Sequence, residues 1–92
     1  MRNYRLDNQW DVELGFEEDG TTTLCQARLI GDRAPAVLGR GEAQRSAVDR
    51  PAPRIGEELA AARALTALAR QLRAQADGEI GEVNRNPAYP DY

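Results

Sequence analysis

The chain has 92 residues, 41% of them hydrophobic and 29% charged, with a formal net charge of −3 at pH 7. This composition is typical of one small globular domain and excludes a disordered chain. All 12 basic residues are arginine and histidine is absent, which excludes serine triads and histidine-ligated metal sites. The acidic balance also argues against a protein that binds nucleic-acid phosphates.

The sequence shows no sign of export or membrane insertion. No apolar run approaches the roughly 20 residues that a membrane-spanning helix needs, and the first residues, MRNYRLDNQW, lack the apolar core of a secretory signal. We therefore expect a cytoplasmic protein. The single cysteine, Cys25, excludes an internal disulfide, and without a histidine to form the thiolate we expect it to be a buried thiol.

Three strands are predicted over residues 9–16, 21–30 and 36–44. In the first, QWDVELGF, large apolar residues alternate with the others, which is the period of a half-buried strand. Asp19-Gly20 is a hairpin signal before the second strand, TTTLCQARLI. The turn GDRAP precedes the third, AVLGRGEAQ. Connections this short predict an antiparallel meander.

One helix is predicted after the connector SAVDRPAPR. Pro53 suits the first helical turn because its missing N–H is not needed there. Gly78 provides a stop signal, so the helix should end at about Ala76. Asp49 is one candidate for the N-cap, and the sequence leaves that choice open.

These elements divide the chain into three parts. Residues 1–8 are predicted to form a polar lead-in, residues 9–76 the folded domain, and residues 77–92 a partly disordered tail that contains Tyr89 and Tyr92.

The helix is expected to pack on the sheet through one broad face. Gly39 and Gly41 should let the helix backbone approach the third strand closely. They do not form a dinucleotide motif, because the third glycine is missing and no helix follows directly. The residues predicted to make this packing are Trp10, Gly39, Gly41, Ala62, Leu65, Ala69 and Leu72.

Two surfaces remain candidates for contact with a partner. One is the helix face opposite the core, where Ala60, Ala64, Ala67 and Ala74 are expected, and where alanine can also serve simply as a good helix former. The other is the polar, mixed-charge open face of the sheet, which solvent alone could also explain. The candidate residues on these surfaces are Arg28, Arg40, Glu42, Arg63 and Arg70.

No arrangement of residues points to catalysis, a cofactor or a metal. The segment EEDG at 17–20 has the spacing of a hairpin turn and not of a calcium loop. Glu57 and Glu58 are adjacent on the helix, so their side chains point about 100° apart and do not converge. We therefore expect a protein that is not an enzyme.

The segments WDVEL, DGTTTLCQARL, GRGEA and DRPAPRIGEELAAARALTALARQL resemble a family of small uncharacterised actinobacterial proteins of unknown function. The resemblance covers about residues 9–72, and the chain departs from the family pattern in the connector, which lacks an asparagine–proline step before Asp49. The resemblance implies a fold like a double-stranded-RNA-binding domain, and it implies no catalytic residues.

The sequence thus predicts an α+β domain in which a three-stranded antiparallel β-meander packs on one long C-terminal α-helix (βββα). Its expected role is that of a non-catalytic interaction or regulatory module that contacts a protein partner or a second copy of itself. The alternative is nucleic-acid binding. That alternative relies on Arg28, Arg40, Arg50 and Arg54, and it is opposed by Glu57 and Glu58 near the helix start.

Overall fold

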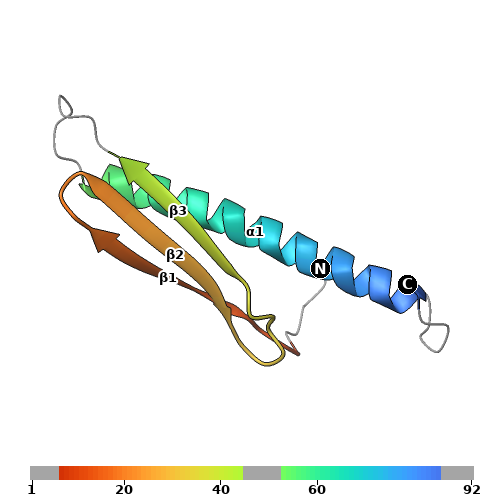
Figure 1. Cartoon of the computed structure of the whole chain (residues 1–92). Helices are drawn as coiled ribbons and strands as arrows, with labels where there is room; N and C mark the ends of the chain where they lie inside the picture. Colours follow the sequence, from red (N-terminus) through yellow and green to blue (C-terminus); the bar gives the residue numbers. More distant parts are fainter. Residues whose placement is uncertain (1–6, 45–52, 86–92) are drawn as a thin grey trace, which may run out of the picture.

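The computed structural model describes residues 7–44 and 53–85. Its elements are β1 (Asp11–Glu18), β2 (Thr22–Ile30), β3 (Leu38–Gln44) and α1 (Pro53–Arg85). The three strands form one antiparallel sheet in the order β1-β2-β3, and α1 lies across one face of it (Figure 1). The predicted βββα order is confirmed, and so is the start of the helix at Pro53.

The turn between β1 and β2 is held by Asp19. Its Oδ1 accepts hydrogen bonds from the backbone N–H groups of Thr22, at 2.8 Å, and Thr21, at 3.2 Å. Gly20 adopts a φ of +97°, which glycine tolerates and other residues rarely do. These hydrogen bonds lower the pKa of the Asp19 carboxyl below its ordinary value, because they favour the charged form.

The core consists almost entirely of small side chains. A Cβ atom on Gly39 would overlap the backbone of Ala64 and Leu68, and one on Gly41 would overlap the backbone of Ala60 and Ala64. Helix and strand therefore touch backbone to backbone, which leaves room only for small groups between them. The buried core residues are Cys25, Ala27, Ala43, Ala60, Ala64 and Leu68.

The helix faces the sheet with a different side from the one that the sequence suggested. Ala60, Ala64 and Leu68, spaced four residues apart on one side of the helix, are buried. The prediction that Ala60 and Ala64 face outward is therefore wrong. The physical reason is the pair of glycines on β3: they favour the closest possible approach, and the helix presents its narrowest side to them.

Several predicted packing residues are consequently at the surface. Ala62 and Ala69 are exposed, Leu65 is 41% exposed and Leu72 is half-buried. Trp10 is 42% exposed. The prediction that these residues fill the core is corrected: only Gly39 and Gly41 of that set are buried.

The helix continues to Arg85, so the predicted end at Ala76 and the stop at Gly78 are wrong. Two side-chain pairs, each between residues four apart, support the helix here: one lies just before the glycine and the other spans it. Arg73 forms an ion pair with Asp77 at 3.1 Å, and Gln75 donates a hydrogen bond to Glu79 at 2.9 Å. The last buried helix residue is Leu68, and the C-terminal part of α1 runs past the sheet (Figure 1). Asp49, Tyr89 and Tyr92 lie outside the described residues.

Candidate interaction surfaces

The large apolar residues of β1 and the tryptophan just before it form an exposed stripe, which we call the apolar stripe; its members are Trp10, Val12, Leu14 and Phe16. Residues directly opposite in an antiparallel pair point to the same side of the sheet. Phe16 lies opposite Cys25, and Leu14 lies opposite Ala27. Because Cys25 and Ala27 are buried beneath α1, the stripe is on the helix side of the sheet. Its members are nevertheless 36–47% exposed.

The stripe is exposed because one helix cannot cover three strands. A helix is about 10 Å wide with its side chains, whereas neighbouring strands are about 4.8 Å apart. The glycines draw α1 onto β3, so it packs on β3 and β2 and leaves β1 uncovered (Figure 1). Every residue of β1 is exposed. Among the described residues the strand is also an edge of the sheet, with one row of backbone groups that no other described strand pairs with.

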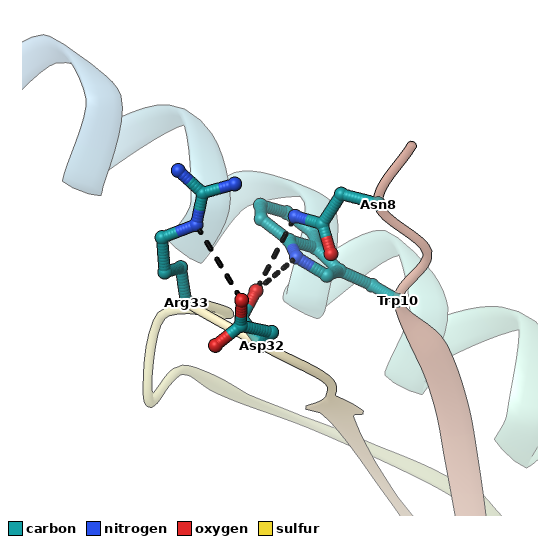
Figure 2. A network of polar contacts seen from close by, with 4 residues as sticks. All are labelled: Asn8, Trp10, Asp32 and Arg33. Carbon is teal, nitrogen blue, oxygen red and sulfur yellow. Dashed lines mark hydrogen bonds and ion pairs between the residues drawn. The ribbon is translucent and has the colours of Figure 1, made fainter. Parts of the chain in front are cut away.

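Trp10 is fixed at one end of the stripe by the turn between β2 and β3. Its indole Nε1–H donates a hydrogen bond to the backbone carbonyl of Asp32 at 3.1 Å, and the Asn8 side chain donates to the same oxygen at 3.3 Å (Figure 2). The Asp32 carboxylate is 3.8 Å from the Arg33 guanidinium. These contacts hold the start of β1 and orient the indole ring.

A second surface lies at the opposite edge, in a groove between β3 and α1. Four of the five candidate partner residues, Arg40, Glu42, Arg63 and Arg70, line this groove, whose volume is ≈ 560 Å³. Arg63 donates a hydrogen bond from Nη1 to the backbone carbonyl of Glu42 at 2.6 Å. The fifth candidate, Arg28, is outside the groove, on the open face of the sheet, to which the Arg40 and Glu42 side chains also belong by their register in β3. Arg28 forms an ion pair with Glu13 at 2.7 Å on that face.

The four arginines of the nucleic-acid alternative are not brought into one site. Arg28 is paired with Glu13, and Arg54 is 3.9 Å from the Glu58 carboxylate. Arg40 lies in the groove, and Arg50 lies outside the described residues. Glu57 and Glu58 are exposed in the second turn of α1.

Reactive groups are few in the described part of the chain. The Cys25 thiol is buried, and burial raises its pKa, so the thiolate is disfavoured. Within residues 7–44 and 53–85, no three histidine, cysteine or acidic side chains come together as metal ligands. In the same residues, no helix has the length and apolar character required to cross a membrane.

The sequence alone did not reveal the apolar stripe as a surface. The alternating pattern of residues 9–16 marks a half-buried strand, and it does not say whether a single helix reaches that strand. The signal that could have done so is the position of the glycines: both lie in the third strand, which places the helix at that edge and leaves the first strand bare.

Comparisons with known proteins give relatives that match most of this chain, and one solved structure with the same fold. The sequence profile of the Rv2632c-like family matches residues 8–89. The uncharacterized protein Mb1767 of Mycobacterium bovis is 34% identical over 79 residues, covering 86% of this chain and 83% of that protein. The uncharacterized protein Rv2632c of Mycobacterium tuberculosis is 36% identical over 76 residues, covering 83% and 81%.

The crystal structure of Rv2632c superposes with a TM-score of 0.71 at 34% identity, covering 95% of this chain and all of that one. The resemblance to uncharacterised actinobacterial proteins is therefore confirmed, whereas the likeness to double-stranded-RNA-binding domains stays a prediction. The match over nearly the whole sequence, together with the shared order of strands and helix, places the chain in the Rv2632c-like family.

Proposed function

We propose that this protein is a non-catalytic interaction module whose first partner is a second copy of itself, bound through β1. The observation that carries the proposal is the apolar stripe: four large side chains, 36–47% exposed, on a strand whose outer edge is open. Water contact with such a stripe is unfavourable, and exposed apolar edge strands pair readily with other chains.

The register of β1 favours pairing with another β1. If Leu14 lies on a two-fold axis, an antiparallel copy places Val12 opposite Phe16 of the second copy, so the two stripes merge into one apolar surface. On the other face of the sheet, Glu13 then lies opposite Gly15 of the second copy. The Glu13 carboxylate already forms an ion pair with Arg28 of its own copy. The six strands would form one sheet with both helices on the same side.

A cost remains at the two ends of this pairing. Asp11 lies opposite Glu17 of the second copy, and like charges directly opposite each other repel. Both residues are exposed, so dissolved salt screens the repulsion. Association should therefore strengthen as ionic strength rises, which is the reverse of the behaviour expected for binding that depends on opposite charges.

A non-catalytic role is supported by the few reactive groups. The chain has no histidine, its cysteine is buried with a raised pKa, and the carboxylate of Asp19 is occupied by the backbone of its own turn. No described groove brings together a nucleophile and a base, which nucleophilic catalysis requires.

Light scattering on the full chain over a range of concentrations tests this proposal. We expect a concentration-dependent dimer for the wild type and a monomer for Leu14→Asp, which places two carboxylates on the two-fold axis. The matched control is Leu38→Asp, since Leu38 is a 47% exposed leucine of the opposite edge strand, and it should still dimerise. Far-ultraviolet circular dichroism verifies that both variants are folded. A wild-type protein that is monomeric at every salt and protein concentration, or a folded Leu14→Asp that dimerises like the control, would overturn it.

A further inference from the structure

We propose that the groove between β3 and α1 binds an extended acidic segment of a partner protein. This inference is independent of the proposed self-association, because the groove lies at the β3 edge of the sheet and the apolar stripe lies at the β1 edge. Three steps lead to it: the length of the groove, the placement of its guanidinium groups, and the chemistry of its walls.

The groove has the dimensions of a short peptide. Its helical wall runs from Leu59 to Arg70, which at about 1.5 Å per residue is a length of about 16 Å. An extended chain rises about 3.3 Å per residue, so about five residues fit along this wall. A single phosphate or carboxylate ion would fill only a small part of a groove of ≈ 560 Å³.

The guanidinium groups give the groove its charge. Arg63 is held in place by its hydrogen bond to the Glu42 carbonyl, so less side-chain freedom is lost when it binds a ligand. Arg70 is exposed and makes no hydrogen bond or ion pair with any other described residue, so its charge is available to a ligand. Arg63 and Arg70 both extend from α1 and give the helical wall of the groove two positive charges, although the chain as a whole is acidic.

The spacing of the arginines selects an extended ligand with several carboxylates. Arg63 and Arg70 are two helical turns apart, about 10 Å along the helix axis. Side chains on one side of an extended segment recur every second residue, about 6.6 Å apart, so glutamates at alternating positions present a row of carboxylates that two long arginine side chains can reach. Arginine binds carboxylates with two parallel hydrogen bonds, which favours this pairing over a diffuse attraction.

The walls between the arginines favour a peptide over a nucleic acid. Leu59 and Ala62 form an apolar part of the groove, which suits the aliphatic side chains of a peptide. Among the described residues, the aromatic rings on which bases could stack are Trp10 and Phe16, which belong to the opposite edge of the sheet.

Fluorescence anisotropy with the full chain tests the proposal, using a labelled synthetic peptide of alternating glutamate and valine as the probe. We expect saturable binding at about 0.01 M salt that is lost at about 1 M salt, because the groove charges are exposed. The charge reversals Arg63→Glu and Arg70→Glu together should weaken binding at least about tenfold, with far-ultraviolet circular dichroism to verify that the variant is folded. The control is Arg85→Glu combined with Arg33→Glu, which changes the net charge by the same amount outside the groove and should leave binding within about twofold.

Each other outcome overturns the proposal. The first is a wild-type protein that does not bind the peptide at low salt, and the second is a groove variant that binds as tightly as its control. A third is equal binding of a peptide with lysine in place of glutamate, and a fourth is tighter binding of single-stranded RNA of the same charge, which would make the groove a nucleic-acid site. Because Leu14→Asp leaves the groove intact, its peptide binding distinguishes a failure of this proposal from a failure of the proposed self-association.

Discussion

Gly41 of β3 and Ala60 of α1 meet so closely that no Cβ atom fits between them. This contact sets the distance between helix and sheet, and with it the small size of every core side chain except Leu68. The same closeness ties the helix to one edge of the sheet. The contact therefore explains both why the small core residues are buried and why the apolar stripe is left exposed.

Gly41→Ala should destabilise the protein by about 1–3 kcal/mol, because the added methyl group overlaps the helix backbone and forces the helix away from the sheet. Urea unfolding at equal protein concentration measures the change. Gly15→Ala is the matched control, since a Cβ on this strand glycine meets no atom within 4 Å, and it should be neutral or stabilising by up to about 1 kcal/mol. Equal losses in the two variants would contradict the close-contact explanation.

Asp19→Ala should reduce stability at neutral pH and remove part of the acid sensitivity of the protein. The pKa of Asp19 is lower in the folded protein than its ordinary value of 3.8. Its contribution is therefore present above that ordinary value and is lost as the pH falls through the lower folded pKa. Urea unfolding of both proteins as a function of pH should show two curves that converge in acid. Curves that stay parallel down to acid pH would refute this role of the carboxylate.

Cys25 should be almost unreactive toward a disulfide reagent in the native protein and should react fully in urea. Burial both shields the sulfur and raises its pKa, so little thiolate is available to attack. The absorbance of the released thiol gives the rate. Complete reaction during mixing, in buffer without denaturant, would show that the thiol is accessible and that the description of the core is wrong.

Gly78→Ala should stabilise α1 by about 0.5–1 kcal/mol, because glycine in a helix interior loses more backbone entropy than alanine. A Cβ at this position meets no atom within 4 Å, so nothing opposes the gain. Circular dichroism at 222 nm should show more helix and a shallower loss of helix on heating. If the helix ended near Ala76, as the sequence suggested, the substitution would leave the helical signal unchanged.

The order of the strands and helix was predictable because each element has its own local signal. The alternation of residues 9–16, the Asp19-Gly20 turn and Pro53 each act over a few residues. The turn and the helix start appear where they were expected, whereas β1 runs from Asp11 to Glu18, two residues later than predicted. Gly39 and Gly41 were also informative, because a pair of glycines on one strand predicts that another backbone lies close to it.

The side of the helix that faces the sheet could not be predicted in the same way. An alanine-rich helix has little difference in hydrophobicity around its circumference, so the larger leucines suggested a buried side that includes Leu65. The structure instead buries Ala60 and Ala64, because the fit of backbone to glycine outweighs the burial of a larger side chain. The end of the helix was missed for a related reason: side-chain pairs four residues apart carry α1 through Gly78.

The hydrogen bond from Arg63 to the Glu42 carbonyl has a consequence for stoichiometry. One backbone oxygen on the outer edge of β3 already accepts a hydrogen bond from a guanidinium, so this edge is partly blocked to a strand of another molecule. Among the described residues, the outer edge of β1 has no such contact. Once two copies have paired through β1, only the two partly blocked β3 edges remain. Association then stops at a dimer. It does not continue into the open-ended assembly that a sheet with two unpaired edges would form.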